Sequence, residues 1–189
     1  GFGPPERLYT SLSLAAGRDL ADIAKEWGVP NDEAARRLQP GSAIYFMMDE
    51  DDVQRIMAHP AAMIGSDGIP GAPHPHPRLW GTFPRVLGHY AGDLKLFPLE
   101  EAVRRMSGLS AKNFGLTGRG TIKSGNYADL VLFDAATIAD TATFEKPIQP
   151  AKGIRQVLVN GRTVWQDGKA TGERPGMALR RQALQAAAA

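Results

Sequence analysis

The sequence contains no cysteine, no long apolar run and no block of like charge. Without cysteine the chain can form neither a disulfide nor a thiolate metal site, a composition that fits the reducing cytoplasm, where we expect the protein. The net charge is only +2 and the basic residues are dispersed, which disfavours nucleic acid as a partner. No apolar stretch approaches the about 20 residues that span a bilayer, so no membrane partner is expected.

The remaining composition is that of a soluble globular protein. The chain has 189 residues, of which 43% are hydrophobic and 22% are charged. This length suffices for one ordinary domain or two small ones. Binding and catalysis therefore have to be sought in local motifs.

The first half alternates between helical and strand-like patterns. Apolar spacing and capping residues predict helices over 20–27, 31–38, 50–58, 83–90 and 98–106, with Ser110 capping one more turn. The continuous apolar runs 42–48 and 61–65 are typical of strands buried on both faces, which places Phe46 and Met47 in the core. The order strand, helix, strand predicts a right-handed βαβ unit.

From residue 116 the sequence changes to short strands and tight turns. Strand-like runs cover 128–133 and both sides of Asn160-Gly161, a dipeptide that predicts a β-hairpin because both residues accept positive φ. The alanine-rich tail 177–189 suggests a short helix. The second half is therefore expected to be β-rich.

An aspartate, Asp67, ends the second apolar run and a loop rich in glycine and proline follows it. The loop carries His74, His76 and Arg78 within the sequence HPHPR. From spacing alone, Asp67 is either a turn residue between Ser66 and a glycine or a functional carboxylate at a strand end. Both interpretations stay open at this point.

The motifs around Asp67 resemble one family. IGSDG followed by HPHPRLWGTFPRVLG is similar to the N-acyl-D-amino-acid deacylases, or D-aminoacylases, of the amidohydrolase superfamily. LEEAVRRMSGLSAKNFGL agrees with this resemblance, and ADLVLFD and VNGRTVW are phrases shared across the superfamily. The resemblance covers residues 18–180.

The resemblance implies an α/β fold. Residues 1–115 would be the C-terminal strands and helices of a metal-dependent hydrolase (β/α)8 barrel, and 116–189 a small β-rich domain of composite β-sandwich type with a C-terminal tail. The family holds its metal mainly through residues of earlier strands, including a His-x-His pair and a cysteine. Because these are lacking and the chain has no initiating Met, we expect a C-terminal portion that binds the missing barrel portion or itself, with little or no zinc of its own.

The resemblance also implies roles for individual residues. A metal lowers the pKa of bound water towards 7, and a base then moves the proton; Asp67 would be that catalytic base and a weak or secondary metal ligand. Arg78 would bind the substrate carboxylate, or be a solvated loop arginine. Met48 would line the substrate pocket or belong to the core. His74 and His76 could be metal ligands or, as we favour, residues that pack the loop or hydrogen-bond to groups around the metal site.

The expected activity follows from the same resemblance. The intact protein would be a zinc-dependent enzyme that hydrolyses an N-acyl-D-amino acid to a D-amino acid and a carboxylate, and the isolated chain would be inactive. Alternatives are an N-acyl-D-glutamate or N-acyl-D-aspartate deacylase and a cyclic amidohydrolase such as a hydantoinase. A non-enzymatic alternative is a β-rich interaction module.

Overall fold

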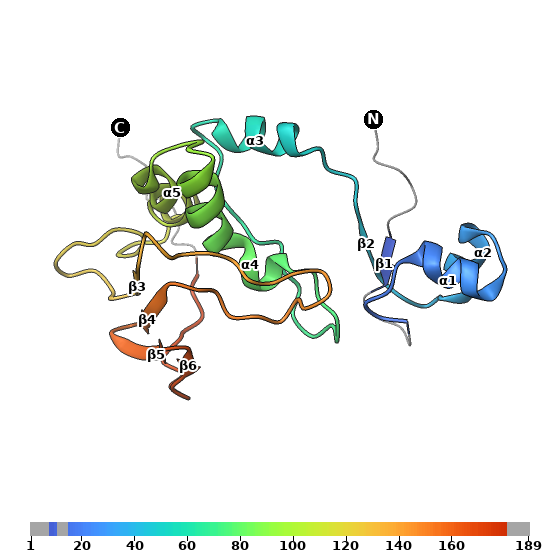
Figure 1. Ribbon diagram of the computed structural model, residues 1–189. Helices are drawn as coiled ribbons and strands as arrows, with labels where there is room; N and C mark the ends of the chain where they lie inside the picture. Colours follow the sequence, from blue (N-terminus) through green and yellow to red (C-terminus); the bar gives the residue numbers. More distant parts are fainter. Residues whose placement is uncertain (1–7, 11–14, 181–189) are drawn as a thin grey trace, which may run out of the picture.

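The computed structural model describes residues 8–10 and 15–180, and Figure 1 shows an N-terminal lobe set apart from a group of helices above an antiparallel sheet. The helices are α1 (Leu20–Trp27), α2 (Asn31–Arg37), α3 (Glu50–Ala58), α4 (Arg78–Arg85), the π-helix η1 (Val86–Asp93), α5 (Leu99–Met106) and α6 (Gly108–Phe114). The strands are β1 (Leu8–Thr10), β2 (Ala43–Tyr45), β3 (Leu130–Phe133), β4 (Ile154–Val159), β5 (Arg162–Gln166) and β6 (Lys169–Ala170). Within these ranges no helix has the length and apolar character needed to cross a bilayer.

The N-terminal lobe consists of α1, α2, β1 and β2. Leu20 and Ala24 lie on the buried face of α1 and pack with Ala34 of α2. Gly28 ends α1 in the left-handed region at φ 64°, the conformation for which glycine is suited. Both predicted helices of this lobe are confirmed.

The predicted βαβ unit is wrong for this chain. β2 is shorter than the run 42–48 and pairs antiparallel with β1, with Leu8 opposite Tyr45. Residues 61–65 form no strand, and every strand pairing among the described residues is antiparallel. Met47, expected in the core, is 56% exposed. A strand of this kind needs a larger sheet around it, and among the described residues β1 is the one strand that pairs with this run.

Arg105 of α5 joins this helix to the end of α3, and its side chain is buried, with only 3% of the residue exposed. Its guanidinium donates hydrogen bonds to the last main-chain carbonyls of α3, those of Met57, Ala58 and His59. These carbonyls lack helical partners, so Arg105 acts as their cap. Its Nε also donates to Glu101 Oε1 at 2.7 Å. Hydrogen bonds from Arg104 and then Arg105 lower the pKa of Glu101 from 4.5 to about 2.

The main core lies where η1 meets α5 and the segment that follows β3. Its buried members are Val86, Leu87, Tyr90, Ala91, Phe97, Ala102 and Ile138. The helix predicted over 83–90 is confirmed as α4 and η1, although α4 already begins at Arg78 because Pro77 occupies its N-cap. Ser110 lies inside α6 instead of capping it.

All strands after residue 116 belong to one sheet of order β3-β4-β5-β6. The hairpin at Asn160-Gly161 is confirmed, since Val159 pairs with Arg162 and both turn residues have positive φ, 48° and 78°. The helix expected in the tail does not form at 177–180, and 181–189 lie outside the described residues.

Replacing Arg105 by Met should destabilise the chain. The three carbonyls at the end of α3 would lose their charged donor and Glu101 would lose one partner, so we expect the free energy of unfolding to fall by about 3 kcal/mol or more. Urea unfolding followed by circular dichroism measures this. The matched control is Arg104→Met, because Arg104 also pairs with Glu101 but is 44% exposed; its cost should be about 1 kcal/mol or less. Equal losses for the two variants would contradict the capping role.

Candidate functional site

An extended segment without strand partners carries Asp67. From 61 to 68 the residues alternate between exposed and partly buried, as in a strand, and Ile64 packs against the main core. In the described structure the main-chain N–H groups of 63–67 make no hydrogen bond to another main-chain atom. Asp67 itself has a positive φ of 46°, which is uncommon for a residue with a side chain. Interactions beyond the segment therefore have to hold Asp67 in place.

Arg78, the first residue of α4, provides these interactions. Its Nε donates to the main-chain carbonyl of Asp67 at 3.0 Å, and its Nη2 lies 2.7 Å from Asp67 Oδ2. The predicted catalytic and substrate-binding residues are thus brought together. The Asp67 carboxylate is 79% exposed and the Arg78 side chain 39%, so the pair stands at the surface of the chain.

A glycine allows this approach. An ideal Cβ placed on Gly68 would lie 2.8 Å from the Leu79 Cα, so only a residue without a side chain lets the turn rest on α4 at this point. The Gly68 N–H is satisfied by the Ser66 hydroxyl at 3.2 Å. The turn that carries Asp67 is therefore packed against the helix that carries Arg78.

His76 lies beside the pair and bonds to the start of α4. Its Nδ1 accepts the main-chain N–H of Arg78 at 3.0 Å. Burial, followed by the charge of Arg78, lowers the pKa of His76 below 6.5, and the smaller effect of Asp67 opposes this. The neutral ring is therefore the form that fits the site near neutral pH.

His74 is held by two parts of the chain that are distant in sequence. Its Nε2 bonds to the main-chain carbonyl of Phe144, and a Cβ on Gly17 would lie 2.9 Å from the His74 ring. The Phe144 ring contacts the His76 ring edge-on, at 5.3 Å between centroids, and the Phe46 ring at 4.7 Å. Both histidines are thus packed in the loop.

The described residues do not by themselves complete a metal site. The described part of the chain contains no group of three or more His, Asp or Glu side chains that could hold a metal ion. One ring nitrogen of His74 and one of His76 are already engaged by main-chain atoms. Asp67 is left as an exposed carboxylate that can supply one ligand but not a complete coordination shell.

Met48, predicted to line the substrate pocket, lies in the extended chain between β2 and α3. Its side chain is 69% exposed, so this chain does not enclose it. The partly buried Phe46, two residues earlier, is the one in contact with Phe144. The alternative that Met48 is a core residue is therefore wrong for this chain, and its pocket role stays a prediction.

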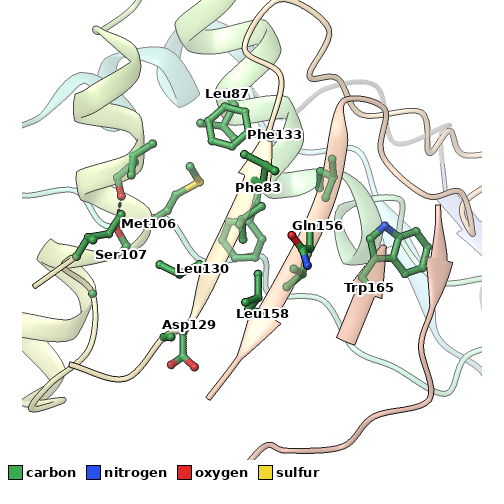
Figure 2. Close-up of a pocket in the computed structure, with 18 of the residues that line it drawn as sticks. Phe83, Leu87, Met106, Ser107, Asp129, Leu130, Phe133, Gln156, Leu158 and Trp165 are labelled. Atoms are coloured by element: carbon green, nitrogen blue, oxygen red, sulfur yellow. Dashed lines mark hydrogen bonds between the residues drawn. The ribbon is translucent and has the colours of Figure 1, made fainter. Parts of the chain in front are cut away.

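A large cavity lies elsewhere, between the helices and the sheet. It has a volume of about 1120 Å³, and its lining includes neither Asp67 nor Arg78. Figure 2 shows Phe83, Leu87 and Met106 on one side and Leu130 and Leu158 on the other. Well-packed interiors leave few voids larger than a water molecule, so the side chains of the described residues leave an unusually large space here.

Sequence reasoning missed two residues that support the site. Phe144 comes from the connection between β3 and β4, and Gly17 precedes α1. The motifs around Asp67 give no signal for either, because both act through contacts between segments far apart in the sequence. The structure is what identifies them.

Comparisons with known proteins agree with the resemblance found in the sequence. A profile described as "Amidohydrolase family" matches residues 20–165. D-aminoacylase of Alcaligenes xylosoxydans xylosoxydans is 60% identical over 168 residues, which are 89% of this chain and 35% of that protein. The chain therefore spans about a third of the length of this relative.

Two solved structures are similar in fold. A crystal structure of D-aminoacylase, described as defining a novel subset of amidohydrolases, has a TM-score of 0.85 and 56% identity and aligns with 88% of this chain and 36% of its own. N-acyl-D-glutamate deacylase from Bordetella bronchiseptica, complexed with zinc and a phosphonate that mimics the tetrahedral intermediate, has a TM-score of 0.82 and 47% identity. It covers 87% of this chain and 36% of its own.

Replacing Gly68 by Ala should push the Asp67 turn away from α4. A methyl group would collide with the main chain of Leu79, and overpacking of this kind costs about 1–3 kcal/mol of unfolding free energy. We expect the NMR signal of the Arg78 Nε–H to shift as its bond to Asp67 lengthens. Gly65→Ala is the control, because no atom lies within 4 Å of its added methyl group; its effect should stay within about 0.5 kcal/mol. An unshifted Arg78 signal in Gly68→Ala would contradict the packing argument.

Proposed function

Because the chain belongs to the amidohydrolase family, we propose that it is the C-terminal portion of an N-acyl-D-amino-acid deacylase. The intact enzyme would hydrolyse the N-acyl amide to a D-amino acid and a carboxylate. The observation that carries this proposal is the contact between the Asp67 carboxylate and the Arg78 guanidinium, 2.7 Å apart. This contact places Asp67, which can carry a proton, beside Arg78, which can bind a carboxylate, at one exposed position of the chain.

Arg78 is proposed to bind the free carboxylate of the substrate. A guanidinium carries five N–H donors, and its Nε/Nη2 side is turned to Asp67. The Nη1/Nη2 edge of the guanidinium stays available. This edge can bind a carboxylate through two parallel hydrogen bonds without releasing Asp67. One side chain can therefore fix both the base and the substrate.

Asp67 is proposed to move the proton. Arg78 occupies Oδ2, which leaves Oδ1 to accept a proton from the attacking water and to return it to the departing amine nitrogen. A base has to be held rigidly relative to the substrate, and Arg78 anchors both the main chain and the side chain of Asp67. The alternative that Asp67 is only a turn residue is not favoured by this double anchor.

Zinc is the proposed cofactor of the intact enzyme, where it would activate water for attack. Its main ligands would come from residues outside this chain, with Asp67 as a weak or secondary ligand. The proposed partner is the missing barrel portion, or a second copy of the chain, in a cytoplasmic protein. Residues 1–115 would contribute to a (β/α)8 barrel and 116–189 would form the small β-rich domain.

The exposed apolar surface of the chain supports such a partner. The cavity of about 1120 Å³ between the helices and the sheet is unfilled. Val131 and Leu132 of the edge strand β3 are 53% and 55% exposed, and Ile69 beside the Asp67 turn is 72% exposed. An unpaired strand edge next to apolar side chains is a surface that other strands can join.

A deacylase for acidic D-amino acids is the second candidate. It is supported by the similarity to an N-acyl-D-glutamate deacylase, which is 47% identical to this chain. The D-aminoacylase structure is more similar, at 56% identity, so this candidate comes second. The two candidates share the roles of Asp67 and Arg78 and differ in the substrate side chain. Comparing kcat/KM for N-acetyl-D-methionine and N-acetyl-D-glutamate in the intact protein separates them.

Asp67→Asn should remove the activity of the intact protein. Asparagine keeps the shape of the side chain but cannot carry the proton, so kcat for N-acetyl-D-methionine should fall by roughly 10²–10⁴-fold. Asp93→Asn is the control, since Asp93 is an equally exposed carboxylate, 76% accessible, on η1. Unchanged kcat in Asp67→Asn would contradict the proposed role.

The isolated chain completes this test. We expect it to show no turnover of N-acetyl-D-methionine and to bind little or no zinc by metal analysis. Metal-dependent turnover by the chain alone, abolished by Asp67→Asn, would mean that no further portion is needed.

Arg78→Lys should weaken substrate binding. Lysine keeps the charge but not the planar fork, and losing a charged hydrogen bond of about 1.5–3 kcal/mol raises KM by roughly 10- to 150-fold. Because Arg78 also anchors Asp67, kcat should fall for N-acetyl-D-methioninamide as well, but KM should not rise for this substrate, which has no carboxylate to grip. Arg85→Lys is the control, because Arg85 is similarly exposed, at 46%, but pairs with Asp140. An equal rise in KM for both substrates would contradict carboxylate binding.

A further inference from the structure

The first turn of α4 uses an unusual acceptor. The N–H groups of Leu79, Trp80 and Gly81 bond to the main-chain carbonyls of His76 and Pro77. The N–H of Arg78 bonds instead to a side chain, the Nδ1 of His76, at 3.0 Å. The first N–H groups of a helix have no partner within the helix, so a side-chain acceptor fixes where the helix begins.

We propose that His76 is a positioning residue that aims the Arg78 guanidinium at Asp67 and at the substrate carboxylate. A main-chain N–H can only donate, so Nδ1 of His76 must be unprotonated and the ring proton must lie on Nε2. In this tautomer the ring ties the Arg78 main chain to the loop. The side chain of Arg78 then turns back across the same loop to Asp67.

Phe144 keeps the His76 ring in this orientation. It approaches edge-on at 5.3 Å between centroids, and its own carbonyl accepts from His74 Nε2. Phe144 also contacts Phe46, which belongs to the segment that leads to Met48. The connection between β3 and β4 therefore supports the loop of the candidate site through one aromatic residue, although it contributes nothing to the Asp67–Arg78 pair itself.

The first test uses this chain alone and does not depend on activity. Long-range ¹H–¹⁵N NMR of the histidine rings should show His76 with Nδ1 unprotonated and Nε2 protonated. Hydrogen exchange of the Arg78 amide should accelerate roughly tenfold in His76→Ala, because about one hydrogen bond is lost. His76→Asn places an amide oxygen near the position of Nδ1 and should keep the amide protected, whereas His76→Gln should not.

The second test is kinetic and rests on the proposed function. In the intact protein, His76→Ala and His76→Gln should raise KM for N-acetyl-D-methionine roughly tenfold while kcat changes less, because the binding group is misplaced. His76→Asn should restore KM. His89→Asn is the control, since His89 is a partly exposed histidine on η1 that contacts Asp93.

The outcomes separate the two proposals. A protonated Nδ1 in His76, an Arg78 amide equally protected in all variants, or failure of His76→Asn to rescue would overturn the positioning role. If the intact protein hydrolyses no N-acyl-D-amino acid, the proposed function fails, and the NMR and exchange results still decide the role of His76.

Discussion

The candidate site depends on one guanidinium that holds both the main chain and the side chain of the same aspartate. Asp67 has a positive φ and lies in a segment without ladder bonds, so no secondary structure fixes it. Arg78 replaces that missing support with bonds to the carbonyl and to Oδ2 of Asp67. Because Arg78 begins α4, the orientation of this helix determines the position of the carboxylate.

Two further arginines, both on α5, fix the other end of the same segment. Arg105 closes the last carbonyls of α3, and Arg104 bonds to the carbonyl of Pro60 at 3.1 Å. The chain from 60 to 78 is therefore tied at its start to α5 and at its end to α4. Since α4 runs directly into η1, which shares the main core with α5, both ties lead to the same packed group of helices. This explains how an irregular loop can present Asp67 in a defined place.

Local patterns in the sequence predicted most of the helices and the Asn160-Gly161 hairpin, whereas Asp67 and Arg78 were singled out by the family resemblance. The helices and the hairpin depend on neighbours in the chain: capping residues, helical spacing and turn residues that accept positive φ. The strands at 42–48 and 61–65 were predicted from apolar runs, and such a run becomes a strand only when another strand pairs with it. Phe144 and Gly17 were beyond prediction, because their role arises from contacts across long sequence separations.

The segment 61–68 connects the failure of the βαβ prediction with the proposed function. Its residues alternate between exposed and partly buried as a strand requires, yet 63–67 have no main-chain partners in the described structure. Alternating exposure without main-chain partners is typical of a strand whose neighbours are lacking, although Asp67 at its end has a positive φ. The cavity between the helices and the sheet and the exposed edge of β3 are two further places where another element could pack. If the proposed barrel supplied those neighbours, Asp67 would stand at the end of a paired strand, where a rigid catalytic carboxylate is expected.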